Sequence, residues 1–317
     1  MHPALSLIFF TVASGAGFGL IGACGMLAAF GAAPGSRWFA VLALGLGLGT
    51  VTIGLLSSVL HLRRKARARF AFSQWRSSWL SREAVLALAT VAIAGLFGLW
   101  WLIANELSVP VRVLGGVAAL FALATVIATG MIYASLKTVR QWHHPMTVPL
   151  FVLMAGATGL AMLCLALALF GALGPRPVGL AMLLLLVTWA LKPAYWRTND
   201  FSISESTAES ATGLGALGAV RLLDPPHTGS SYLLDEMGYK VARKHAEKLR
   251  IVAIVAGGIA PIALYALAIV WTYAGPVAWL LCLLAAACAL LGALVERWLF
   301  FAEATHTVTL YYGAKTA

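Results

Sequence analysis

Charged side chains are scarce in this chain. Asp, Glu, Lys and Arg make up 10% of its 317 residues, hydrophobic residues make up 61%, and the mean hydropathy is +0.90. No charged residue at all occurs between positions 251 and 295. This composition excludes an ordinary soluble domain. It is typical of a polytopic membrane protein, in which lipid covers the apolar surface.

Cysteine and histidine are missing from the places where a resident cofactor would need them. The four cysteines lie inside apolar runs without a CxxC pair, so we expect packing residues and no iron–sulfur cluster, zinc site or disulfide framework. All seven histidines fall at predicted span ends, in loops or in the tail, whereas b-type cytochromes place histidine pairs deep in facing helices. We therefore expect no metal, no covalently bound cofactor and no catalytic residue. The cysteines are Cys24, Cys164, Cys282 and Cys288.

Eight apolar runs are long enough to cross a membrane, since about 20 helical residues at 1.5 Å each span the hydrocarbon core. We predict an all-α bundle of eight transmembrane helices that forms a single integral membrane domain over 1–317. Lys192 is expected to snorkel from the end of the sixth span. The predicted spans are 5–32, 38–60, 83–104, 112–135, 147–172, 178–196, 250–272 and 277–302.

Lys and Arg are distributed unevenly between the two sides of such a bundle. With eight spans, all 22 cations except Arg37, Arg112 and Arg176 fall on the side that holds both termini. The positive-inside rule then places both termini and the basic loops in the cytoplasm, including the long loop 197–249, which carries a predicted short helix. Because the cations cluster beside apolar spans, we attribute the net charge of +11 to membrane orientation and not to nucleic-acid binding.

Glycine is abundant and falls inside the predicted spans. Gly15 and Gly19 are four residues apart, as are Gly45 and Gly49. Small residues at this spacing let the backbones of membrane helices approach closely. We expect both pairs to form helix contacts.

The stretch SSVLHLRRKARARFAFSQW, residues 57–75, places a histidine where the second span ends. Ser58 lies one helical turn before His61, on the same face. A histidine of near-neutral pKa can donate a hydrogen bond to a quinone carbonyl and exchange its proton, while the isoprenoid tail stays in lipid. The spacing equally fits an interfacial histidine among stop-transfer cations.

The basic loop that follows predicts a docking surface. Its cations and aromatic residues could seat an acidic partner surface by complementarity. Ser81 and Glu83 suit the start of the third span, where the helix dipole favours an acid. The predicted docking residues are Arg63, Arg64, Lys65, Arg67, Arg69, Trp75, Arg76 and Trp79.

A second polar group lies in the last span, in the stretch LVERWLFFAEATHTVTLYYG, residues 294–313. Glu296 and Glu303 are seven residues apart and so share a face, with His306 one turn further. A carboxylate within a span is costly and indicates function, here proton exchange with a quinone site. Alternatively, the carboxylate pairs with Arg297 or with a donor on another helix.

Several of these stretches together resemble the membrane-anchor subunit of dimethyl sulfoxide reductase, the DmsC family, which includes anchors of sulfite dehydrogenases. The resemblance rests on HPALSLIFFTVASGAG, GLLSSVLHL, AFSQWRSSWLSREA, IYASLKTVRQWHHP and ERWLFFAEATHTVTLYYG. It runs over most of the chain and is weakest in 197–235. It implies a multi-pass protein of the bacterial inner (plasma) membrane with eight spans and no redox cofactor of its own.

The resemblance also implies partners and a site. Family members hold a molybdopterin catalytic subunit and an iron–sulfur subunit on the membrane and exchange electrons with the quinone pool, ubiquinone or menaquinone. The histidine that closes the second span is the family's quinone-site residue and matches His61. Relatives often continue it as HLG-x-P-x-RA, whereas this chain reads HLRRKARARFAF, so only His61 is carried over.

Three functions follow as hypotheses. The first is a quinone-interacting anchor of a molybdopterin oxidoreductase, in anaerobic or sulfur-compound respiration, with a cytoplasm-facing sulfite dehydrogenase as one variant. The second is a scaffold without a quinone site. The third, a transporter, is disfavoured, because spans one to seven carry no charge at mid-depth and only Pro261 lies well inside a span.

Overall fold

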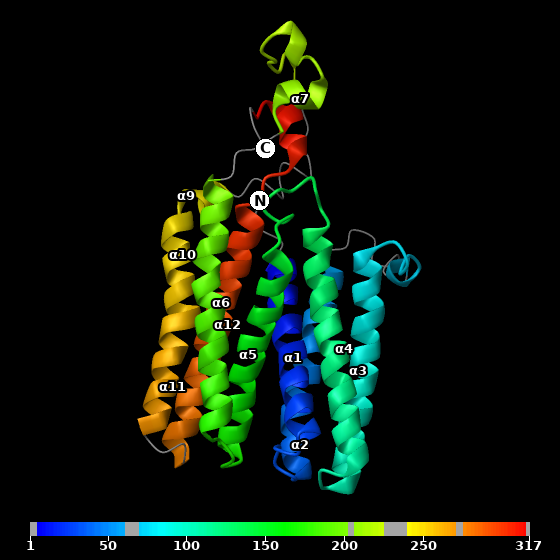
Figure 1. The fold of residues 1–317 in the computed structure, drawn as a ribbon, viewed down its shortest axis with the longest axis vertical. Helices are drawn as coiled ribbons and strands as arrows, with labels where there is room; N and C mark the ends of the chain where they lie inside the picture. The colour runs from blue at the N-terminus through cyan, green and yellow to red at the C-terminus, as the bar shows by residue number, and fades with distance from the viewer. Residues whose placement is uncertain (1–4, 61–69, 202–205, 225–239, 271–274, 315–317) are drawn as a thin grey trace.

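The computed structural model describes residues 5–60, 70–201, 206–224, 240–270 and 275–314. Within these residues the chain is almost entirely helical, and eight helices are long and apolar enough to cross a membrane. They stand side by side as one elongated bundle (Figure 1). The predicted all-α class and the count of eight spans are confirmed.

The helices begin and end close to the predicted limits, with two informative differences. The third starts four residues early, so Glu83 lies one turn inside it, and the sixth continues five residues past 196, so Lys192 is interior. The seventh crossing is built from three consecutive elements, α10 (Ala246–Ile254), η3 (Val255–Ile259) and α11 (Ala260–Val270). The other spans are α1 (Leu5–Ala29), α2 (Arg37–Leu60), α3 (Trp79–Ala104), α4 (Val109–Ala134), α5 (Thr147–Leu169), α6 (Pro175–Phe201) and α12 (Gly275–Ala302).

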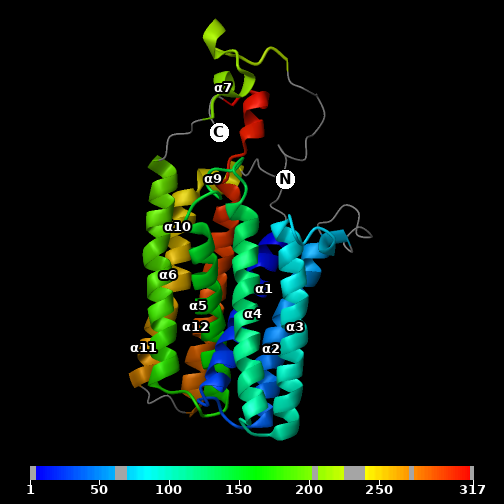
Figure 2. The same cartoon turned by 45° about the vertical axis from the view of Figure 1, so that its right-hand side comes forward.

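Two groups of helices meet along α1 and α5. Helix α1 packs against α2, α4 and α5, and α3 completes this group by packing on α4 and α2. Helix α5 packs against α6 and α12, and α12 against α10 and α11. The two views show the groups as neighbouring columns (Figures 1 and 2). Helix α5 is the most buried span, since 78% of its most apolar 18-residue stretch lies inside the protein.

Glycines set the closest helix crossings. A methyl group on Gly19 of α1 would collide with the carbonyl oxygen of Ala155, and one on Gly159 of α5 would collide with the backbone of Gly19. The predicted contact at Gly19 is therefore present. The prediction for Gly45 and Gly49 is wrong, because nothing lies within 4 Å of a Cβ at either position. Those two glycines face away from the neighbouring helices.

The seventh crossing changes from α-helix to one π-helical turn at η3. Pro261 lacks an amide hydrogen, and its ring clashes with the carbonyl four residues earlier, at Gly257. The widened turn also lies where Gly257 meets Gly292 of α12 and the indole of Trp189 of α6. The irregular turn is thus explained by one proline and by close packing on two sides.

The end of the bundle at which α1, α3, α5 and α10 begin, and α2, α4, α6 and α12 finish, is called the basic end here. The short elements α7 (Ala208–Thr212), η2 (Gly215–Leu217), α9 (Lys240–Lys244) and η4 (Thr307–Tyr312) lie at or beyond this end (Figure 1). Backbone contacts between Val139 and His306, and from the Thr307 amide to the Thr138 carbonyl at 3.1 Å, join the α4–α5 loop to the segment after α12.

Candidate functional site

The predicted quinone histidine and most of the basic loop fall outside the described residues. These are His61, Arg63, Arg64, Lys65, Arg67 and Arg69. Their neighbours on both sides are described, at the end of α2 and the start of α3. Both helix ends lie at the basic end, so the predicted site is bounded by known structure.

Ser58 lies in the last turn of α2, and within the described residues its hydroxyl bonds only its own helix. Its Oγ donates to the Leu55 carbonyl at 2.7 Å, and the side chain is half-buried. The neighbouring Ser57 is buried and also donates to the Ser6 carbonyl of α1 at 3.1 Å. The α1–α2 contact at this end is therefore made by Ser57. The role of Ser58 toward a quinone stays a prediction.

The described part of the docking surface is an exposed aromatic segment held by one arginine. Trp75 is 53% exposed, and the guanidinium of Arg76 lies 5.4 Å from its ring centre. Arg82 donates to the carbonyls of Trp75 at 3.0 Å and Arg76 at 2.7 Å, and lies 4.3 Å above the ring of Trp79. Tryptophans of this kind sit at membrane–water boundaries. The segment is thus fixed at the start of α3.

Glu83 is buried between α3 and α4, one turn inside the basic end. Thr129 of α4 donates to its carboxylate at 2.5 Å. Deeper between the same two helices, Thr90 and Thr125 share a hydrogen bond of 2.9 Å. Sequence reasoning gave Glu83 only a helix-start role. The signal that could have identified it is the cost of a carboxylate inside a span, which makes such a residue a functional candidate by default.

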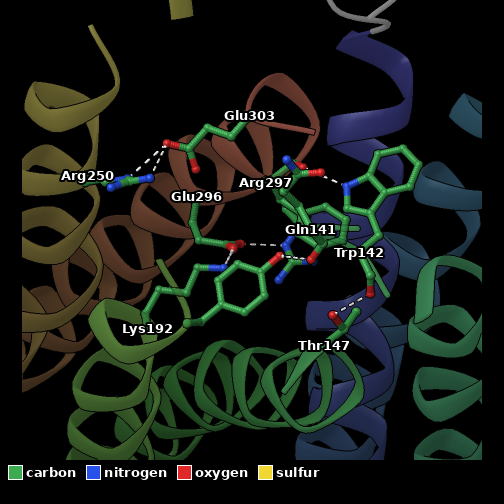
Figure 3. A network of polar contacts seen from close by, with 10 residues as sticks. Gln141, Trp142, Thr147, Lys192, Arg250, Glu296, Arg297 and Glu303 are labelled. Atoms are coloured by element: carbon green, nitrogen blue, oxygen red, sulfur yellow. Dashed lines mark hydrogen bonds and ion pairs between the residues drawn. The ribbon is translucent and has the colours of Figure 1, made fainter. Parts of the chain in front are cut away.

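Glu296 forms a buried ion cluster with two cations (Figure 3). Its carboxylate pairs with the Lys192 ammonium from α6 and, at 2.6 Å, with Nε of the adjacent Arg297. The side chains of these three residues are 0%, 1% and 4% exposed. The predicted snorkelling of Lys192 is therefore wrong, because α6 continues past it and an acid on α12 receives it. Six residues separate Glu296 from the end of α12, or about 9 Å of helix.

Aromatic rings surround this ion cluster. The Lys192 ammonium lies 4.1 Å from the ring centre of Tyr195, and the Arg297 guanidinium 3.9 Å from that of Phe151. Such cation–ring contacts replace part of the hydration that buried cations lose. The indole of Trp142 stacks on Phe300 and donates to its carbonyl at 2.8 Å. Figure 3 shows Trp142 beside Arg297.

A small cavity lies between Thr129, which binds Glu83, and Arg297, which binds Glu296. It has a volume of about 20 Å³ and is lined by Arg297 and Thr129, together with Ser14 and Thr158. Arg297 Nη1 is buried and has no hydrogen-bond partner within the described part of the chain. Most of its lining is apolar, and its volume has room for about one water molecule. Such a water would lie between Arg297 and the hydroxyl that binds Glu83.

Glu303 lies just beyond α12 in a second, more open ion cluster. Arg250 of α10 donates a hydrogen bond to Glu303 at 2.9 Å. It donates two more to the Asp200 carboxylate, at 2.6 and 2.8 Å. Burial raises the pKa of the Glu303 carboxyl above its ordinary value, and the Arg250 charge opposes that shift. Glu296, inside α12, and Glu303, just past its end, therefore lie in two different ion clusters.

A polar cleft of about 680 Å³ opens at the basic end above these clusters. Tyr195 and Phe300 lie in its wall, and Arg250 and Glu303 are also among its lining residues. Gln141 ties the α4–α5 loop to this region by exchanging two hydrogen bonds with Thr305, at 2.8 and 3.1 Å. The cleft brings water close to the aromatic layer that covers Glu296.

Charge is arranged unequally along the described parts of the spans. Acids and cations lie toward the basic end or, in the case of Arg37, Arg112 and Arg176, at the opposite rim. Between these two levels the described spans carry no charged residue. The described spans therefore concentrate their ionisable groups near the basic end and carry no charged path to the opposite rim.

Comparison with known proteins identifies the family. Residues 1–212 match the family model described as the DMSO reductase anchor subunit, DmsC. The chain is also 33% identical to a sulfite dehydrogenase subunit from Allochromatium vinosum, over 98% of this chain and 99% of that one. The second match includes α10–α12 and therefore both clusters around Glu296 and Glu303. A bundle of eight spans with these likenesses is a multi-pass membrane anchor of an oxidoreductase complex, and the chain belongs to the DMSO reductase anchor subunit family.

Proposed function

We propose that this anchor is the quinone-interacting subunit of a molybdopterin oxidoreductase complex and passes electrons between the quinone pool and an iron–sulfur partner subunit. The observation that carries the proposal is the gathering of buried ionisable groups at one end of the spans. Glu83, Lys192, Glu296 and Arg297 all lie toward the basic end. A site that reduces or oxidises a lipid-soluble quinone needs proton-exchanging groups at one membrane boundary.

The chemistry requires two electrons and two protons for each quinone that becomes a quinol. The iron–sulfur partner supplies or removes the electrons, and water at the basic end supplies or removes the protons. His61 would donate a hydrogen bond to a quinone carbonyl and exchange its proton. Glu83 lies one turn inside the next helix at the same end, where its carboxylate can exchange a proton with the site. Glu303, which lines the cleft, would exchange protons with its water, and Glu296 would exchange them only through the Lys192 and Arg297 cluster that buries it.

The orientation supports a cytoplasm-facing complex. The excess of Lys and Arg at the basic end supports a cytoplasmic location for both termini and for the docking surface, in a bacterial plasma membrane. The catalytic subunit and the iron–sulfur subunit would then dock on this face. The name of the Allochromatium relative supports sulfite oxidation as the reaction, with electrons entering the quinone pool.

The test is the variant His61→Ala in the assembled complex. Quinone-coupled electron flow should be lost, while the catalytic subunit still turns over with a soluble dye and still copurifies with the membrane. His143→Ala is the matched control, because His143 lies at the same end, is exposed, and bonds the Ala134 carbonyl. It should keep full quinone activity.

The alternative outcome identifies a scaffold. Normal quinone-coupled turnover in His61→Ala would contradict the proposed site. Loss of membrane attachment after charge reversal within 63–82, combined with normal His61→Ala turnover, would show an anchor that binds quinone elsewhere or not at all. Solute uptake by the purified chain in liposomes would instead indicate a transporter.

A further inference from the structure

An apolar groove runs along the half of the bundle that faces away from the basic end. It lies among α1, α4, α5 and α6 and has a volume of about 620 Å³. Its floor contains Gly22 and Ala23 of α1, and its walls include the exposed side chains of Leu120 of α4 and Leu180 of α6. Small residues between larger ones create the hollow. Because its walls are exposed apolar side chains of spans, it opens toward lipid.

The length of the groove matches one leaflet of a membrane. Its lining on α1 runs from Phe18 to Leu27, about 14 Å at 1.5 Å per residue, and continues past the helix end to Ala32. Its lining on α5 runs from Val152 to Leu163, about 17 Å. Half of a hydrocarbon core of about 30 Å is about 15 Å. The hollow therefore has the depth of the acyl chains of a single leaflet.

Among the described residues that line the groove, one is charged, and it lies at the outer rim. Arg176 lies in the first turn of α6, is exposed, and makes no hydrogen bond or ion pair with any residue that the structure describes. Arg112, on the same side of the bundle, instead donates Nε to the Ala29 carbonyl at 3.2 Å. A cation at a helix N-terminus is disfavoured by the helix dipole, so an anion bound there would meet two positive features.

We infer that the groove binds one phospholipid of the leaflet opposite the basic end. An acyl chain fills the hollow, and the phosphate accepts hydrogen bonds from the Arg176 guanidinium, whose planar fork matches phosphate geometry. A quinone carbonyl can accept a hydrogen bond from the arginine but has no negative charge to pair with it, so the phosphate is the better partner. The bound lipid seals the seam between α4 and α6. This site is independent of the proposed quinone site.

Lipid retention by the full-length chain tests the inference. The protein is purified in mild detergent supplemented with phosphatidylglycerol, and retained molecules are weighed by native mass spectrometry. Wild type should retain one phosphatidylglycerol per chain. Arg176→Gln should lower that retention about tenfold, as expected from loss of one charge-assisted contact. Arg37→Gln, at the same rim but outside the groove lining, should retain the lipid.

A second variant separates the groove from the rim charge. Ala23→Phe places a ring in the hollow and should lower retention even though Arg176 remains. Equal retention by wild type and both variants would overturn the inference, as would absence of bound lipid in wild type. A retained mass equal to a quinone, or to a second copy of the chain, would also overturn it by naming a different occupant.

Discussion

The two halves of the bundle are built from the same eight helices by different means. Toward the basic end, helices are joined by buried ion pairs and hydrogen bonds, such as Glu296 with Lys192 and Glu83 with Thr129. In the other half, α1 crosses α4 where Gly25 meets Gly115, and the surface is hollowed by an apolar groove. The difference separates a half held together by buried polar groups from one held together by close apolar packing.

The comparison explains why the polar half is tolerated in a membrane. Each buried charge there has an opposite charge, a hydroxyl or an aromatic ring within contact distance. Without such partners, burial in lipid would cost several kcal/mol per group. The apolar half needs no such compensation, because close backbone approach supplies its cohesion.

The largest expected effect on the polar half comes from removing one charge from the buried cluster of Glu296, Lys192 and Arg297. Glu296→Gln leaves Lys192 and Arg297 as two buried cations without a carboxylate. Removing one member of a buried ion pair costs about 3–5 kcal/mol. We expect a large drop in the thermal unfolding midpoint in detergent, and poor recovery of folded protein.

Two variants serve as controls for the charge balance. Lys192→Met leaves Glu296 with the neighbouring Arg297, a neutral pair, and should destabilise less than Glu296→Gln. Glu303→Gln touches the more open cluster and should cost about 1 kcal/mol or less. Equal losses in Glu296→Gln and Glu303→Gln would mean that the buried cluster contributes nothing beyond a surface ion pair.

The packing half is tested at a glycine crossing. Gly159→Ala forces a methyl group into the backbone of Gly19 and should destabilise the bundle by about 1–3 kcal/mol, as overpacking does. Gly45→Ala is the matched control on α2, where open space surrounds the position. It should be neutral or slightly stabilising, since alanine is the better helix former. Unfolding midpoints of both variants, compared in the same detergent, measure the difference.

Much of this fold could be predicted because apolar runs of about 20 residues have few alternatives in a membrane. Hence all eight spans were predicted within a few residues of their ends. The sequence does not predict which face of each span contacts which neighbouring helix. From spacing alone, Gly45 and Gly49 are as good candidates for a helix–helix contact as Gly15 and Gly19. Four-residue spacing does not tell which face of a helix meets a neighbour.

The candidate site was predictable to a similar degree. The common face of Glu296 and Glu303 follows from helical periodicity, but the partner of Glu296 does not. The apolar run of the sixth span stops at 196, so the sequence places Lys192 near a span end, where a lysine ordinarily snorkels. Only the helix continuing to Phe201 shows that the ammonium remains inside. The proposed role of His61 rests on its place in the sequence and on the family.

The smallest expected effect concerns the segment that closes the basic end. His306 precedes η4, and its Nδ1 accepts a hydrogen bond from the Val308 amide at 3.0 Å, which requires the neutral ring. Burial lowers the pKa of His306 below its ordinary value, so the closed segment binds a proton less readily than the open one. The closed conformation of this segment is therefore fully stabilised at pH values above the ordinary histidine pKa of about 6.5. This stabilisation is lost as the pH falls through the lowered pKa of His306.

Hydrogen exchange of the η4 amides, corrected for intrinsic rates, measures this effect between about pH 5 and pH 8. Protection should fall toward the acidic side in the wild type. His306→Asn keeps a side-chain acceptor before the turn and cannot titrate, so its protection should stay level. His144, whose pKa burial also lowers, is present in both proteins. If both proteins lose protection equally at acidic pH, the titrating group is therefore not His306. Only a loss of protection confined to the wild type shows that neutral His306 stabilises this segment.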